Sequence, residues 1–173
     1  MFILYITALI IVIFLLETVV IDLFIGRGVK PDFILIITVY SGLFLNKTTA
    51  ETIGFAFGLI QDALSFRQMG INSLSKFLIG YSIGSLRENI LSENVIVQCL
   101  FTFIASCLNG IIYILILKGL FYSEIEVLDF FNDLLIQALY NTFLAPIIFL
   151  MLNRVQFNNV REFRGRKHEA RTD

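Results

Sequence analysis

The stretch Gly54–Arg87, GFAFGLIQDALSFRQMGINSLSKFLIGYSIGSLR, consists of two apolar segments joined by a polar turn. Each segment carries one GxxxG motif, formed by Gly54 and Gly58 in the first and by Gly80 and Gly84 in the second. Glycines at this spacing share one helix face and let two backbones approach closely. The stretch therefore predicts a helical hairpin, whose glycine faces pack either within the chain or against another protein.

Polar side chains flank the turn of this hairpin. Asp62 precedes the end of the first helix, and Lys76 follows about five residues into the second, so each lies about 5–8 Å deep in a bilayer. Opposite charges at matched depth should pair, because either alone is costly in hydrocarbon. Gln61, Asn72 and Ser75 can satisfy the remaining donors and acceptors. We expect an Asp62–Lys76 ion pair, which serves either as an internal clamp or as a partner or ligand site.

The composition of the whole chain is typical of a membrane protein. Of the 173 residues 57% are hydrophobic and only 16% are charged, whereas soluble proteins average about 45–50% and about 25%. Spans of about 20 residues leave no room for a soluble domain. The fold class is an all-α integral membrane bundle of six helices. The predicted spans cover residues 2–25, 33–45, 49–65, 71–87, 95–117 and 133–152, and a basic tail follows at 153–173.

The charges predict the orientation of this bundle. An even number of spans puts both termini on one side, and the tail alone carries six of the thirteen Lys and Arg residues. An excess of positive charge marks the cytoplasmic side, so both termini are predicted to be cytoplasmic, with the tail near anionic lipid headgroups. Cations clustered on a folded face are missing from the sequence, which argues against nucleic-acid binding.

The spans at 49–65 and 71–87 are short for a hydrocarbon core of about 30 Å. Short helices with glycines are usually shielded by neighbours, so we expect these two inside the bundle. The first span contains Glu17, which is either protonated or paired, and Lys76 is the only cation in the interior of a predicted span, since Arg87 closes the fourth. Glu17 therefore joins the candidate site residues.

The last two spans carry polar groups of their own. Asn109 and Asn141 can form hydrogen bonds between helices. Pro146 lacks an N–H, so it leaves a backbone carbonyl near Thr142 without its helical partner and should kink the helix. We interpret these side chains as packing contacts rather than ligands.

The known catalytic patterns are not found in this sequence. It has no GxSxG, no HExxH and no Walker loop, and its one histidine, His168, lies in the tail. The sequence therefore lacks the residue patterns that nucleophilic catalysis, zinc catalysis and phosphate transfer require. We expect a protein that is not an enzyme and that holds no cofactor or metal.

The order of motifs resembles a known family, that of the bacterial rod shape-determining protein MreD. The resemblance depends on KPD at residues 30–32, followed by GLIQD, MGINSLSK and GYxxGxxR. Phe66 stands where many members have glycine, and the turn lacks their proline. The residues that fall in the family's order are Gln61, Asp62, Ser65, Gly70, Asn72, Ser73, Leu74, Lys76, Gly80, Tyr81, Gly84 and Arg87.

The resemblance implies a multi-pass protein of the bacterial cytoplasmic membrane. It would act as a non-catalytic scaffold or regulator of peptidoglycan synthesis during cell elongation and so maintain rod shape. Its implied partners are MreC, bound helix to helix, and, directly or indirectly, MreB, RodA and a penicillin-binding synthase. The family is also similar in fold to the S components of energy-coupling-factor transporters. The alternative function is therefore S-component-like binding or transport of a small molecule.

Overall fold

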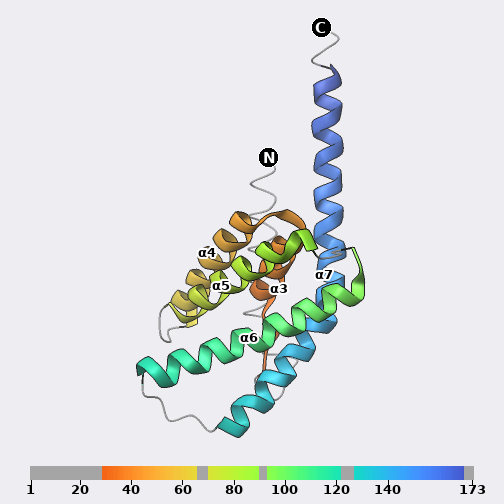
Figure 1. Ribbon diagram of the computed structural model, residues 1–173. Coiled ribbons are helices and arrows are strands. Elements are labelled where there is room, and N and C mark those ends of the chain that lie inside the picture. The colour runs from red at the N-terminus through yellow and green to blue at the C-terminus, as the bar shows by residue number, and fades with distance from the viewer. Residues whose placement is uncertain (1–28, 66–69, 90–92, 122–126, 170–173) are drawn as a thin grey trace.

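The computed structural model describes residues 29–65, 70–89, 93–121 and 127–169, which form helices and short connections without a strand (Figure 1). The first predicted span, 2–25, lies outside these residues. A π-helical turn, Ser41–Leu45, continues α3, and a 3-10 turn, Arg87–Asn89, follows α5. The five α-helices are α3 (Phe33–Tyr40), α4 (Lys47–Ser65), α5 (Ile71–Leu86), α6 (Val95–Phe121) and α7 (Val127–Glu169).

The short helix α3 lies at the centre of the described helices. Nearly all of its side chains are buried, and Ile36 and Val39 are fully inaccessible. They pack against Ile79 of α5 and Phe149 of α7 in one apolar cluster. A helix that is apolar on every side is stable only when neighbours surround it, which is the position that α3 occupies.

Helices α4 and α5 were predicted to lie inside the bundle, and this expectation is wrong. Each presents one outward apolar face, represented by Phe55 and Leu64 on α4 and by Leu74 and Leu78 on α5, all between 40% and 51% exposed. The two helices pack on each other through their small residues, and this leaves their large side chains on the opposite faces. The interior place is taken by α3.

Two helices, α6 and α7, are long and apolar enough to cross a membrane, over Val95–Gly119 and Leu128–Arg154. Both exceed the spans expected at 95–117 and 133–152, since α6 ends at Phe121 and α7 runs from Val127 to Glu169. The predicted tail therefore begins as a continuation of α7. Hydropathy marks the part of a helix that suits lipid, whereas the backbone hydrogen bonds can continue into polar sequence.

The course of α7 changes direction between its cyan and blue parts (Figure 1). The helix contains Pro146, which removes the hydrogen bond to the carbonyl of Thr142. That carbonyl instead accepts a weak hydrogen bond from the Cys99 thiol of α6, with an S–O distance of 3.8 Å. The predicted free carbonyl is therefore confirmed, and α6 supplies its partner.

Candidate functional site

The glycine faces of α4 and α5 meet each other directly. A methyl group added at Gly54 would lie 2.5 Å from the carbonyl oxygen of Lys76, and one at Gly80 would lie 2.6 Å from that of Ala50. Real Cβ atoms do not approach backbone atoms this closely. At these two positions the backbones of the helices touch, and only glycine fits.

The remaining motif glycines continue the same contact. A methyl group at Gly58 would lie 2.6 Å from the Cα of Ser73, and one at Gly84 would lie 2.5 Å from the Cα of Lys47. The partners run in opposite directions along the two helices, so the hairpin is antiparallel. The four GxxxG glycines thus pack within the chain, which answers the question that the sequence left open.

Asp62 of α4 caps the beginning of α5. Its two carboxylate oxygens accept hydrogen bonds from the backbone N–H groups of Gly70, Asn72 and Ser73, each at 3.0 Å, and from Nδ2 of Asn72 at 2.9 Å. Gly70 occupies the N-cap position with φ of 100°, in the left-handed region, and has no side chain to cap the helix. The neighbouring helix therefore supplies the cap, and the negative charge lies at the positive end of the α5 dipole.

The predicted Asp62–Lys76 ion pair is not formed. Lys76, which is fully buried, pairs instead with Asp32, at 2.8 Å from Nζ to Oδ2. Its ammonium group also donates to Oδ1 of Asn72 at 3.3 Å. Since Nδ2 of that amide donates to Asp62, Asn72 lies between the lysine and the carboxylate that was expected to bind it.

The physical reason for this correction is the supply of backbone donors. Asp62 lies opposite the first turn of α5, where N–H groups have no helical acceptor, and these groups satisfy its charge. Lys76 lies one turn further along α5, on the side that faces α3. Matched depth alone did not reveal which carboxylate is within reach of the ammonium group.

Asp32 is the site residue that sequence reasoning missed. It is the N-cap of α3, where Oδ1 accepts from the N–H of Leu35 at 2.9 Å while Oδ2 pairs with Lys76. It is 4% exposed, and its own backbone N–H donates to Oδ1 of Asn141 at 2.7 Å. The signal was present in the sequence, since aspartate after Pro31 and before an apolar run is a helix-start pattern.

The polar contacts continue from Asp32 and α5 into the two long helices. Nδ2 of Asn141 on α7 donates to Oγ of Ser106 on α6 at 2.9 Å. Oγ of Ser75 on α5 donates to Oδ1 of Asn109 on α6 at 2.8 Å. The two asparagines therefore join helices, as predicted. We call the whole set the polar core: Asp32, Asp62, Asn72, Ser75, Lys76, Ser106, Asn109 and Asn141.

The other candidate residues lie apart from the polar core or beside it. Gln61 is half-buried on α4, next to Asp62. Arg87 lies at the opposite end of the hairpin, where its guanidinium donates to the carbonyl of Leu45. Glu17 lies outside the described residues. Within the described ranges, His, Cys, Asp and Glu nowhere form a group of three that could hold a metal ion.

The comparison with known families explains why these motifs occur together. The profile of the rod shape-determining protein MreD matches residues 1–155. The chain belongs to the MreD family. The resemblance predicted from KPD and MGINSLSK is thereby confirmed, and rod shape determination is the role of the MreD family. Neither a curated protein nor a solved structure gives a significant match to the sequence.

In this member of the MreD family, the polar core connects all five described helices. Asp62 links α4 to α5, Lys76 links α5 to α3, and Asn141 links α7 to both α3 and α6. Buried polar groups in hydrocarbon are costly unless they are satisfied, and here the side chains satisfy one another. The arrangement fixes the relative positions of the helices.

Proposed function

We propose that the chain is a non-catalytic membrane scaffold or regulator of the cell-elongation machinery that binds the membrane helix of MreC. Its value to the machinery is a rigid bundle with an apolar outer surface. The further partners MreB, RodA and a penicillin-binding synthase are reached through this complex or directly. The observation that carries the proposal is the polar core, which turns short helices into one body and leaves apolar surface outside it.

The most exposed apolar side chains in the middle of a long helix lie on α7. Phe143 is 76% exposed and Ile147 is 57% exposed, and Leu139 and Leu150 continue the same face at 50% and 64%. Residues three and four apart share a helix face, so these four side chains form one stripe. We assign the MreC helix to this α7 stripe.

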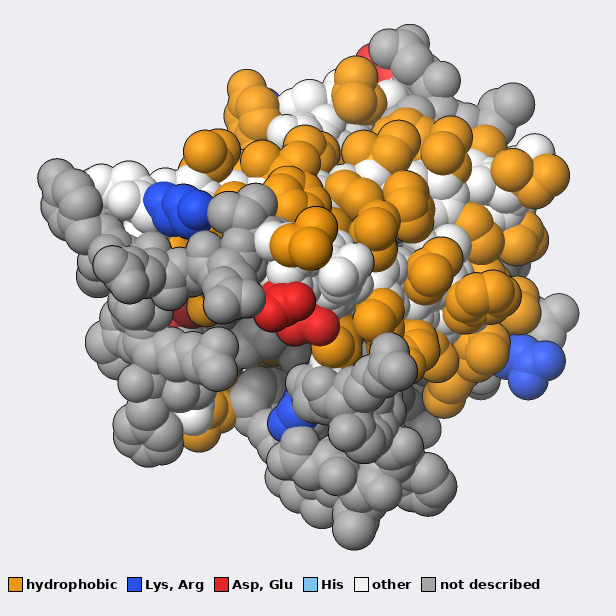
Figure 2. All heavy atoms as spheres, turned by 90° about the horizontal axis from the view of Figure 1, so that it is seen from below, with side chains coloured by type: hydrophobic (Ala, Val, Ile, Leu, Met, Phe, Trp, Pro, Cys, Tyr) orange, Lys and Arg blue, Asp and Glu red, His pale blue; other side chains and the backbone are white. Residues whose placement is uncertain are grey.

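The surface around α6 and α7 suits lipid and membrane helices. Figure 2 shows the molecule from below, on the side where α6 and the first part of α7 lie in Figure 1. Hydrophobic side chains cover a broad area there, and charged side chains lie towards its margins. Helix association within a bilayer depends on close packing rather than on the hydrophobic effect, and a rigid partner lowers the entropic cost of that packing.

The proposed topology has six spans with both termini in the cytoplasm. Lys47 and Arg87 support it, since both lie at one end of the hairpin, and in this topology the end of the second span and the end of the fourth face the cytoplasm. The first span and the likeness to S components stay predictions.

The proposal is tested by co-purification with full-length MreC. The double variant Phe143→Ala with Ile147→Ala removes the two central side chains of the α7 stripe. We expect recovery of MreC to fall about tenfold, which corresponds to about 1.4 kcal/mol of lost contact energy. The melting temperature in detergent should stay close to that of the wild type, because neither side chain is buried.

A matched control lies on α6, where Ile104 and Leu108 are each 43% exposed at the same spacing. Their double alanine variant removes a smaller but still exposed apolar area and should leave MreC recovery within twofold of wild type. Undiminished recovery from the α7 variant would contradict the assignment, and so would equal losses from both variants.

The alternative function, binding of a small molecule between the helices, has less support. In the described part of the bundle, the side chains of the polar core form hydrogen bonds and an ion pair with one another and do not line the cavity that the structure contains. A ligand that bound there would raise the melting temperature by mass action. A melting screen against small metabolites therefore separates the two functions, because a scaffold shows no such gain.

A further inference from the structure

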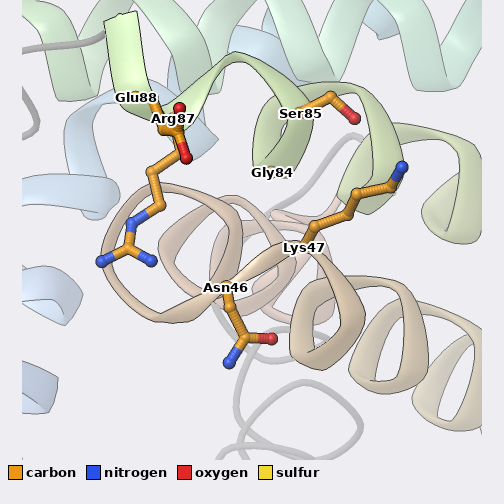
Figure 3. A pocket seen from close by; sticks show the side chains of 6 residues that line it. All are labelled: Asn46, Lys47, Gly84, Ser85, Arg87 and Glu88. Atoms are coloured by element: carbon orange, nitrogen blue, oxygen red, sulfur yellow. The ribbon is translucent and has the colours of Figure 1, made fainter.

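The described surface has a cavity of about 830 Å³ at the end of the hairpin opposite Asp62. Fifteen residues of α4 separate the two places, or about 22 Å along the helix. Figure 3 shows the lining, which comes from the beginning of α4 with the residue before it, and from the end of α5 with the 3-10 turn after it. The lining residues are Asn46, Lys47, Gly84, Ser85, Arg87 and Glu88.

Two cations flank this cavity. In Figure 3 the side chains of Lys47 and Arg87 extend to opposite sides of it. The Lys47 ammonium lies 3.7 Å from the centroid of the Tyr81 ring, and the Arg87 guanidinium donates to the carbonyl of Leu45. Among the described residues neither cation forms an ion pair, so both have donors left for an anion.

The charge of the lining suits a single negative charge. Lys47 and Arg87 contribute two positive charges, and Glu88, which also lines the cavity, contributes one negative charge. The remaining charge of +1 matches the one negative charge of a phosphodiester. Guanidinium and ammonium groups are the usual protein partners of phosphate oxygens.

Apolar surface begins at the edge of the cavity and runs along α5. Tyr81 is 46% exposed, and Leu78 and Leu74 continue from it at 40% and 47%. With Ser85 of the lining, these residues follow a spacing of three and four and so share one outward helix face. A ligand with a phosphodiester and long acyl chains would fit both parts, whereas a soluble anion would use only the cavity.

We propose that this cavity binds the headgroup of an anionic phospholipid such as phosphatidylglycerol. The phosphodiester lies between Lys47 and Arg87, and one acyl chain lies along Leu78 and Leu74. Lys47 is held over the Tyr81 ring, which places its ammonium group at the boundary between polar cavity and apolar face.

The test titrates purified, delipidated full-length protein in detergent with phosphatidylglycerol or phosphatidylcholine and counts bound lipid by native mass spectrometry. Wild type should bind phosphatidylglycerol at least about tenfold more tightly than phosphatidylcholine. The double variant Lys47→Gln with Arg87→Gln should lose this preference. The matched control, Lys118→Gln with Arg154→Gln, removes two exposed cations elsewhere and should keep it.

A third variant protects the test against misfolding, because the Arg87 guanidinium also donates to the Leu45 carbonyl and the Lys47 ammonium lies over the Tyr81 ring. Glu88→Gln leaves the described bonds of the hairpin intact and removes the negative charge of the lining. It should tighten phosphatidylglycerol binding about threefold or more. Weaker or unchanged binding in this variant would count against the proposal.

Two further outcomes would overturn it. Equal losses from the control and the cavity variants would show a general attraction of cations for anionic lipid. Displacement of the lipid by inorganic phosphate or glycerophosphoglycerol at equal concentration would assign the cavity to a soluble anion, because the acyl chains would then contribute nothing.

Discussion

The hairpin of α4 and α5 and the pair of α6 and α7 solve the same packing problem in different ways. In the hairpin, glycines bring backbone against backbone, as at Gly80 and Ala50. In the α6–α7 pair, the interfacial glycine Gly110 faces the side chain of Leu134. Backbone atoms cannot move without moving the helix, whereas a leucine can change its rotamer.

This difference separates a fixed region from an adaptable one. The hairpin allows no added atom at its four motif glycines, and a polar cap fixes its turn. The α6–α7 pair is joined by side chains, among them Asn141 and Cys99, and it exposes more large apolar groups. We therefore place partner binding on the long helices and positional control in the hairpin.

The largest expected effect comes from filling the glycine contact. Gly80→Leu should leave no folded protein, because every rotamer of leucine meets the α4 backbone. Gly80→Ala should cost about 1–3 kcal/mol through overpacking. The melting temperature in detergent and the yield of monodisperse protein measure both variants.

Two other glycines test whether the two interfaces differ in rigidity. Gly110→Ala should cost less than Gly80→Ala, since the Leu134 side chain can turn away. Gly119→Ala meets no atom within 4 Å and should stabilise α6 by up to about 1 kcal/mol through helix propensity. Equal losses at Gly80 and Gly110 would show that the two interfaces are equally rigid.

The next largest effect comes from the link between the two regions. Lys76→Met leaves the Asp32 carboxylate buried without its cation, which typically costs about 3–5 kcal/mol. Adding Asp32→Asn to it should recover part of the loss, because the amide keeps an acceptor for the α3 cap and carries no charge. Thermal melting of both single variants and the double variant gives the coupling energy.

A second cycle, with Asp62→Asn in place of Asp32→Asn, serves as the control. Asn72 lies between Asp62 and Lys76 and bonds to both, so the coupling in this cycle should be present but weaker than in the Asp32 cycle, at about 0.5–1 kcal/mol. If the Asp62 cycle shows the stronger coupling, the assignment of the ion pair is wrong.

The hairpin could be predicted from sequence because its signals are local. The GxxxG spacing fixes which face is small, whereas the sequence paired Asp62 with Lys76 and not with the N–H groups of the turn. The sequence also located the carbonyl freed by Pro146, since the missing N–H affects a residue four positions away. Such inferences need only the geometry of one helix or one turn.

The partner of Lys76 could not be found in the same way. Asp32 is 44 residues away in sequence, and its contact depends on how α3 fits among four other helices. The burial of α3 could not be predicted for the same reason. Its length indicated a short span, and its central position depends on the packing of the other helices. The end of α7 was misplaced because hydropathy reports on lipid contact and not on helix continuity.

The attachment of the polar core to the long helices should contribute less than the buried Asp32–Lys76 ion pair. Asn141→Leu keeps the number and branching of the side-chain heavy atoms but leaves the backbone N–H of Asp32 and the hydroxyl of Ser106 without this partner, at a cost of about 1–3 kcal/mol. Adding Ser106→Ala removes one of the two orphaned groups and should restore part of the melting temperature. Asn132→Leu, at an exposed position on the same helix, should change it by less than about 0.5 kcal/mol. Since Asn141 contacts both α3 and α6, a loss no larger than that of Asn132→Leu would mean that apolar packing holds α7 to the centre, and that the polar core reaches the long helices only through Ser75 and Asn109.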